Sequence, residues 1–461
     1  MLVNDIMVIC MFLTFIALLF TGFPIAFVLG GTAMIFTIVG ELADLYLDTL
    51  TGLDLNLLGM VDSRLFKLMS NWILVAVPMF IFMGLMLDKS GIAERMMQSM
   101  QNLFGKVRGG LAVTVAVIGI VLAASTGIIG ASVVLLGVLS LPAMLHQGYN
   151  KSLALGTVAA SGTLGILIPP SIMLVVMADQ LNLSVGDLFM GAVFPGLILG
   201  FLYIAYILVV GLVKPDFAPL SPQRRDLSWA VAWDSLKTVT PPAMLIVLVL
   251  GSIFAGMATP TEASGVGALG ATVLAAWNRK LNFQVIKDVT INTFRTCGYI
   301  FGIFVGAQAF AIVLRMLGGD EFVEAALTGL SLGPMGVIAV ILLAVFFMGF
   351  FLDWIEICLI VLPLLAPVVK SLGLGINGYG VIDNPELVWF TVLVAVSLQT
   401  SFLTPPVGFA IFFIQGVAPK EVVLMDIYKG VVPYVLLQLT GLALVALWPQ
   451  LVVWLPAVAY R

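Results

Sequence analysis

The sequence contains few charged residues. Only 10% of its 461 residues are charged, 61% are hydrophobic, and the mean hydropathy is +1.18. A soluble globular chain carries about 25% charged residues. Apolar runs long enough to cross about 30 Å of hydrocarbon recur from one end to the other, and no stretch resembles a soluble domain. The sequence therefore predicts a polytopic, all-helical membrane protein.

The sequence lacks the residues that several kinds of chemistry need. His146 is the single histidine, which leaves no histidine proton relay and no zinc site, and there is no HExxH motif. Three cysteines, Cys10, Cys297 and Cys358, are too few and too far apart for a disulfide framework or a metal site. No Gly-Lys-Ser/Thr occurs, so an ATP-driven pump is excluded. The chain is not expected to be an enzyme, to bind nucleic acid, or to need a cofactor other than a coupling ion.

The positions of Lys and Arg indicate the topology, because basic residues in short loops mark the cytoplasmic side. Most of them lie in the segments 88–108, 146–151, 214–237, 279–295 and 418–429. Placing these segments inside puts both termini in the periplasm. The N-terminus, MLVND, has no basic residue, so we expect the first apolar run to be a retained span rather than a cleaved signal peptide.

Two apolar stretches are too short for two crossings and have polar centres. Residues 111–144 begin and end on the cytoplasmic side, although two crossings need about 40 residues and a turn, and their centre is AASTGIIGAS (123–132). Residues 335–368, with the centre GFFLDWIEI (349–357), enter from the other side. Both patterns predict re-entrant helical hairpins, whose tips must be buried in protein or line a wet cavity.

The chain divides into two halves of similar plan, 1–225 and 226–461. The first half has predicted spans at 3–20, 23–40 and 72–88, an amphipathic stretch at 91–105, the hairpin 111–144, and spans at 152–178 and 188–213. The second has spans at 238–256, 262–277 and 292–316, a polar-apolar stretch at 320–330, the hairpin 335–368, and spans at 387–417 and 430–456. Each half contains an odd number of full crossings, which predicts inverted repeats, the plan typical of secondary transporters.

The span after each hairpin cannot be a continuous helix. The sequences are SGTLGILIPPS (161–171) and SLQTSFLTPPVG (397–408), whose Pro pairs are 236 residues apart. Pro in a helix interior costs about 3 kcal/mol, so each pair should unwind its span. Unwinding exposes carbonyls beside the hydroxyls of Ser161, Thr163, Thr400, Ser401 and Thr404. Such oxygens suit sodium, and the half-helix N-termini suit a carboxylate. The alternative is that small residues and Pro serve only packing and kinks.

Four charged residues in or beside apolar segments suggest a function, a structural role, or both. Asp353 and Glu356 at the second hairpin tip are costly in a membrane and suggest a function, but Asp353 alternatively caps the returning half-helix. Glu262 lies in ATPTEAS and favours a helix start, with Thr259 as N-cap, over ion binding. Arg315 closes a span and is expected to extend to the membrane surface.

At these residues the chain resembles the large membrane subunit (DctM type) of the tripartite ATP-independent periplasmic (TRAP) transporters. The resemblance is carried by GTLGILIPPS (162–171), ATPTEAS (258–264), GFFLDWIEICLIVLPLLAP (349–367) and TPPVG (404–408). It implies sodium-coupled uptake of a small carboxylate across the bacterial inner membrane by an elevator mechanism. It also implies two partners: a separate small four-span membrane subunit and a periplasmic substrate-binding protein.

The resemblance also implies the residues of the site. One sodium site would use Ser125, Thr126, Gly127, Gly130 and Ser132 with Ser161, Gly162, Thr163 and Gly165. A second would use Gly349 and Asp353 with Gln399, Thr400, Ser401 and Thr404. The substrate would lie near Pro170, Ser171, Pro406 and Gly408. Two features depart from the family: an acidic linker at 41–71 that is longer than usual, and a first tip that is more apolar.

The nearest alternative is a stand-alone sodium- or proton-coupled anion or dicarboxylate transporter with the same inverted hairpins. It would need no partner chain, so copurification would separate the two hypotheses. A channel is disfavoured because no segment resembles a ring-forming selectivity filter.

Overall fold

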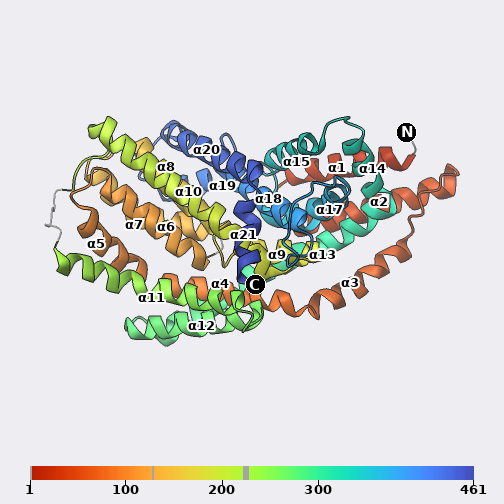
Figure 1. Ribbon diagram of the computed structural model, residues 1–461. Helices are drawn as coiled ribbons and strands as arrows, with labels where there is room; N and C mark the ends of the chain where they lie inside the picture. Colours follow the sequence, from red (N-terminus) through yellow and green to blue (C-terminus); the bar gives the residue numbers. More distant parts are fainter. Residues whose placement is uncertain (1–2, 127–128, 222–227, 461) are drawn as a thin grey trace. The chain divides into compact units, whose positions relative to one another are not determined.

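The computed structural model describes residues 3–126, 129–221 and 228–460, and every regular element in these ranges is a helix (Figure 1). Nine helices in the described ranges are long and apolar enough to cross a membrane. They are α2 (Ile25–Tyr46), the segment Trp72–Lys89 that includes α4 (Ala76–Lys89), α7 (Ile129–His146), α10 (Val185–Val213), α11 (Trp229–Phe254), α13 (Phe283–Met316), the segment Trp354–Ser371, α18 (Pro385–Leu403) and α20 (Leu424–Leu447). The all-helical membrane fold is confirmed.

Shorter helices complete the chain. They are α1 (Val3–Leu19), α3 (Met60–Met69), α5 (Ile92–Phe104), α6 (Gly110–Thr126), α8 (Lys151–Thr163), α9 (Ile172–Leu181), α12 (Pro260–Trp277), α14 (Gly319–Thr328), α15 (Pro334–Met348), α16 (Trp354–Glu356), α17 (Leu362–Ser371), α19 (Phe409–Val417) and α21 (Gln450–Ala459). Residues 430–456, which the sequence predicts as one span, contain parts of two helices. The helix breaks at Trp448, because the following Pro449 disfavours helical backbone at the residue before it.

The helices form two compact units. The first unit contains Met1–Trp72, Asp179–Asn182 and Phe294–Gly375, and the second contains Ile73–Ala178, Leu183–Thr293 and Ile376–Arg461. The second predicted hairpin belongs to the first unit, whereas the first hairpin and both Pro-Pro breaks belong to the second. Compactness and internal duplication are different properties, so the repeat boundary near residue 225 stays a prediction.

The acidic linker at 41–71 is folded. The Asp44 carboxylate accepts hydrogen bonds from the Thr49 hydroxyl (2.7 Å), from the Thr51 amide and hydroxyl (both 2.8 Å), and from the Gly52 amide (3.0 Å). These bonds close the loop that follows α2 and place buried Leu53 against Gly40. At least one of the linker's acidic residues therefore has a structural role.

The start of α12 has the predicted cap. The Thr259 hydroxyl accepts a hydrogen bond from the Glu262 amide (3.3 Å), and the Glu262 carboxylate accepts one from the Thr259 amide (2.8 Å). This reciprocal pair is a capping box, so the structural interpretation of Glu262 is confirmed.

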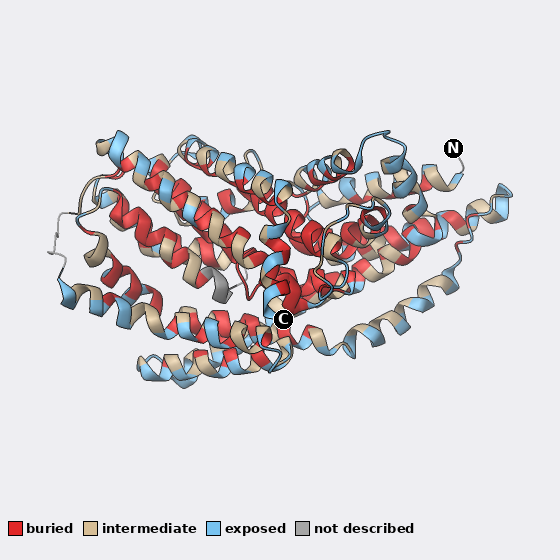
Figure 2. Ribbon diagram, viewed as in Figure 1, coloured by how far each residue is buried: buried red, intermediate tan, exposed pale blue. Residues whose placement is uncertain are grey.

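Like α18, which is buried from Leu387 to Leu403, helix α8 is enclosed in the second unit and is buried from Leu153 to Thr163 (buried residues are red in Figure 2). Its backbone touches three helices because glycines stand at the crossings. A Cβ on Gly156 would overlap the Gly430 carbonyl of α20, and one on Gly162 would lie 2.5 Å from Val133 Cγ2 of α7. On α6, a Cβ on Gly119 would lie 2.7 Å from Ser161 Cβ. The hairpin α6–α7 and α20 therefore hold α8 between them.

We predict that Gly156→Ala destabilises the protein by about 1–3 kcal/mol, because the new methyl group meets backbone that no side-chain rotation can move. Thermal unfolding of the purified protein measures the effect. Gly251→Ala on α11 is the control, since nothing lies within 4 Å of a Cβ there. Equal melting temperatures for the two variants would contradict the close crossing of α8 and α20.

Candidate functional site

The first Pro-Pro break interrupts the polypeptide in the interior of the second unit. Helix α8 ends at Thr163, a short 3₁₀ turn follows at Leu164–Ile166, and α9 begins at Ile172. The peptide bond between Pro169 and Pro170 is cis. Residues 161–171 are all buried. The predicted unwinding is confirmed, and it occurs in the buried interior of the unit.

Several backbone groups of this break have no backbone partner. In the described part of the chain, the carbonyls of Leu167, Ile168, Pro169 and Pro170 accept no backbone hydrogen bond, and the amides of residues 171–173 donate none. The Ser171 hydroxyl donates to the Ile166 carbonyl (2.5 Å) and accepts from the Leu174 amide (3.5 Å), which caps α9. Because buried backbone groups are nearly always paired, this set indicates a place for a ligand or ordered water.

The second break has the same cis Pro-Pro bond but is shorter and has a different exposure. Helix α18 ends at Leu403, the Pro405-Pro406 bond is cis, and α19 begins at Phe409. The Thr404 hydroxyl donates to the Thr400 carbonyl (2.7 Å), and the Thr400 hydroxyl donates to the Val396 carbonyl (2.8 Å). Pro406 is exposed and its carbonyl accepts from the Tyr428 hydroxyl (3.1 Å), whereas Pro170 and Ser171 are buried. Thr404 is half-buried and Gly408 is buried.

The two broken helices meet at equivalent positions. Thr163 and Gln399 are 236 residues apart, the same separation as the Pro pairs, and Gln399 Nε2 donates to Thr163 Oγ1 at 3.5 Å. The Tyr203 hydroxyl accepts from Gln399 Nε2 (3.4 Å) and from Gln438 Nε2 (2.8 Å). All four side chains are fully buried. One hydroxyl on α10 thus links α18 with α20, next to α8.

Sequence reasoning missed Tyr203 and Gln438. The signal that could have found them is a polar group inside an otherwise apolar predicted span, which is costly unless it has a partner or a function. Nothing in the sequence showed that these two residues meet each other and Gln399.

Three buried polar atoms near the breaks have no hydrogen-bond partner in the described part of the protein: Ser161 Oγ, Gln399 Oε1 and Gln438 Oε1. Turning the Gln399 amide over would pair its oxygen with the Tyr203 hydroxyl but leave its nitrogen unpaired, so either orientation leaves one end free. An unpaired buried polar group costs about 1–3 kcal/mol. Neutral oxygens of this kind are ligands for a hard cation, so the residues present fit sodium.

The other residues predicted for the first sodium site lie around α8. Gly130 packs against the Phe413 ring of α19, with an added Cβ 2.8 Å from the ring, and Ser132 is buried on α7. Gly165 is buried in the 3₁₀ turn. Ser401, predicted for the second sodium site, is buried on α18. The side chains of Ser125 and Thr126, and Gly127, lie outside the residues that the structure describes. The hairpin and both breaks thus belong to one unit.

Gly349 and Asp353 lie in the first unit, so the predicted second sodium site, shared with Gln399–Thr404, stays a prediction. Gly349 ends α15, and Asp353 Oδ1 accepts from the Trp354 amide (2.8 Å). The cap predicted for Asp353 is confirmed. Glu356 is fully buried, and neither of its carboxylate oxygens has a hydrogen-bond partner among the described residues.

We predict that Tyr203→Phe destabilises the protein by about 1–3 kcal/mol, because the amides of Gln399 and Gln438 lose their shared acceptor while the ring is kept. Tyr206→Phe is the matched control. Its ring packs on Tyr434 as Tyr203 does, at the same centroid distance of 5.2 Å, but it takes no part in this network. Thermal unfolding measures the loss of stability in each variant. Equal losses would show that the Tyr203 hydroxyl does not stabilise the protein through this network.

Comparisons with known proteins identify the family of this chain. Residues 12–451 match the family described as "Tripartite ATP-independent periplasmic transporter, DctM component". The chain is 28% identical to the C4-dicarboxylate TRAP transporter large permease protein DctM of Vibrio cholerae, over 97% of this chain and 96% of that protein. It is 30% identical to the ectoine/5-hydroxyectoine large permease protein UehC of Ruegeria pomeroyi, over 97% and 98%.

Among solved structures, the fold is similar to that of the YdaH transporter of Alcanivorax borkumensis. The TM-score is 0.57 at 15% sequence identity, and the match covers 83% of this chain and 88% of that one. The match to the family spans nearly the whole chain and includes the hairpins, both Pro-Pro breaks and the capped start of α12. This protein therefore belongs to the tripartite ATP-independent periplasmic transporters, as their DctM component.

Proposed function

We propose that this chain carries a small organic acid, a carboxylate, together with sodium across the bacterial inner membrane. It would work by an elevator mechanism with a small four-span membrane subunit and a periplasmic substrate-binding protein, and its termini would face the periplasm. The observation that carries the proposal is the buried break between α8 and α9, where, among the described residues, four carbonyls accept no backbone hydrogen bond and the Ser161 hydroxyl has no hydrogen-bond partner.

The chemistry of the break favours sodium over a proton as the coupling ion there. Residues 161–171 are Ser, Gly, Thr, Leu, Ile and Pro, none of which titrates near neutral pH. The same segment offers neutral oxygens, which bind a hard cation without burying a second charge. Gln399 Oε1 and the Thr163 hydroxyl oxygen, whose proton is donated to the Ala160 carbonyl (2.9 Å), stand beside it as further acceptors.

The start of α9 supports an anionic substrate. The unpaired amides at residues 171–173 lie at a helix N-terminus, which carries a partial positive charge and binds carboxylates. A cation held by the preceding carbonyls would add a full positive charge close by, so its binding would strengthen that of the anion. This linkage couples the two without any direct contact between them.

The names of relatives support the substrate class but not one compound. One relative is named for C4-dicarboxylates and another for ectoine and 5-hydroxyectoine, at similar identity to this chain. Family membership therefore leaves the individual substrate open. It does favour a carrier that depends on partners over the stand-alone anion transporter, since the family is described as tripartite.

We predict that sodium raises the melting temperature of the purified chain when it replaces potassium at constant ionic strength. A ligand at ten times its dissociation constant stabilises by roughly 1.4 kcal/mol. Ser161→Ala should abolish most of the sodium effect, because it removes an unpaired oxygen at the break.

Ser140→Ala is the matched control, since Ser140 is equally buried but its hydroxyl already donates to the Leu136 carbonyl (2.5 Å). Identical melting temperatures of the unmodified protein in sodium and potassium would contradict specific sodium binding by this chain. An equal loss of the sodium effect in both Ser variants would show that the break is not the site.

A further inference from the structure

The segment between α2 and the next span runs along one surface of the membrane. The flanking segments, Ile25–Tyr46 and Trp72–Lys89, are long and apolar enough to cross. Consecutive spans are joined on one side of the bilayer, so residues 47–71 begin and end at the same surface. Tyr46 and Trp72 mark the two ends and are 76% and 55% exposed. Aromatic residues at span ends lie at the level of the lipid head groups. Because α3 ends at Met69, shortly before Trp72, its C-terminal end lies close to this level.

Helix α3 has three different sides. The side made by residues 61, 64, 65 and 68 is half-buried against the first unit, where Arg64 Nη1 donates to Gln308 Oε1 of α13 (3.5 Å). An exposed polar side contains Ser63 and Lys67, which are one turn apart. Between these two sides lie Phe66 and Met69, with exposed fractions of 74% and 84%. An apolar side next to a charged one is the pattern of a helix that lies in the plane of the membrane interface.

The apolar side occupies the C-terminal half of α3. Asp62 lies one turn before Phe66 on the same side, in the first turn of the helix, where the partial positive charge of the N-terminus favours a carboxylate. Phe66 and Met69 follow, and Trp72 begins the next span. This side therefore becomes apolar toward the point at which the chain enters the membrane. Such a gradient is expected of a helix whose C-terminal half lies deeper than its start.

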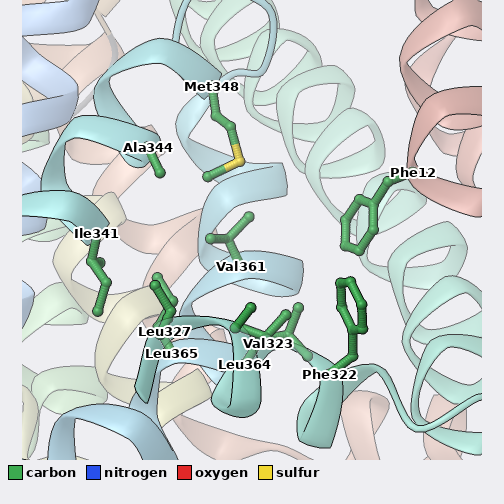
Figure 3. A pocket seen from close by; sticks show the side chains of 11 residues that line it. Phe12, Phe322, Val323, Leu327, Ile341, Ala344, Met348, Val361, Leu364 and Leu365 are labelled. Carbon is green, nitrogen blue, oxygen red and sulfur yellow. The ribbon is translucent and has the colours of Figure 1, made fainter. Parts of the chain in front are cut away.

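The chain itself leaves the apolar side of α3 uncovered. No residue of α3 is buried, and in the described ranges the helix packs chiefly on the 3₁₀ turn Leu55–Gly59 that precedes it. An apolar cavity of about 240 Å³ in the same unit is different, because it lies between helices. Figure 3 shows Phe12 of α1 and Phe322 of α14 facing each other on one side of it. The walls of the cavity face each other, whereas the apolar side of α3 needs cover from outside the chain.

We propose that α3 is an interfacial helix that anchors the first unit to the lipid bilayer. Phe66 and Met69 insert about 5–10 Å into the boundary between head groups and acyl chains, and Lys67 stays among head groups and water. The contact of Arg64 with Gln308 attaches the helix to α13, so the lipids hold this unit at a fixed depth. The leaflet is the periplasmic one in the topology given above, and only this last point rests on the proposed function.

A protein partner explains this surface less well. Two side chains of this size offer on the order of 300 Å² of apolar area, whereas a stable protein interface buries about 800 Å² on each partner. The core of such an interface is also depleted in Lys and Asp, and here Lys67 and Asp62 border the apolar side. A bilayer sets no minimum area, and its head groups accommodate both charges.

Collision measurements with a spin label test the proposal on the full chain in dioleoyl phosphatidylcholine nanodiscs. A nitroxide is attached through a genetically encoded ketone amino acid, one position at a time, so that the native cysteines remain. Oxygen collects in the acyl region, and a nickel chelate stays in water. We expect oxygen collisions to exceed nickel collisions at least twofold at positions 66 and 69. We expect the reverse at position 63, the matched control on the polar side of the same helix.

An excess of nickel collisions at positions 66 and 69 would show that this side faces water. Few collisions of either kind would show that protein covers it, and both results overturn the proposal. A photo-crosslinker at position 66 in native membranes should capture lipid, and capture of a polypeptide would equally contradict the proposal. All the labelled positions are exposed, so the labels do not disturb packing. Sodium-dependent melting reports on the break in the second unit, so the two proposals stand or fall separately.

Discussion

The structure depends on one constraint: a helix interrupted in an apolar interior must find partners for the backbone groups that it frees. Pro169 and Pro170 remove two amide donors, so the carbonyls before them cannot pair along the helix. The protein tolerates this loss because α8 is clamped by its neighbours. Glycines at 119, 156 and 162 let three helices reach its backbone, and that contact keeps the break in place.

The two breaks share a cis Pro-Pro bond and differ in their length and surroundings. The first is sealed, with Pro170 and Ser171 fully covered, while the second reaches the surface at Pro406. A cation needs a site from which water is excluded except where it serves as a ligand, whereas a substrate must enter and leave. The hydrogen bond from Gln399 Nε2 to Thr163 Oγ1 connects the two regions, and Tyr203, held by Gln438, also accepts from the Gln399 amide. Ion binding at the buried first break would thus affect α18 through these hydrogen bonds.

Features that depend on local sequence were predictable. The Pro-Pro breaks, the Thr259–Glu262 capping box and the Asp353 cap follow from residues adjacent in the chain, and each is present. Most helical ranges followed from apolar runs, but α11 and α13 begin nine residues before the predicted spans, and Pro449 divides the final span. The contacts of Tyr203 with Gln399 and Gln438 join residues 196 and 235 positions apart, which no local pattern reveals.

The central claim is that unpaired oxygens at the α8–α9 break hold sodium, and equilibrium binding of radioactive sodium to the purified chain tests it most directly. The decisive comparison is with the double variant Pro169→Ala/Pro170→Ala, which allows the helix to continue, so that the carbonyls of residues 167–169 can pair with the amides of residues 171–173. We expect saturable sodium binding by the unmodified protein and a loss of at least tenfold in affinity for the variant, with helical content retained or increased. Unchanged binding by a folded double variant would show that the sodium site lies elsewhere and would contradict the account.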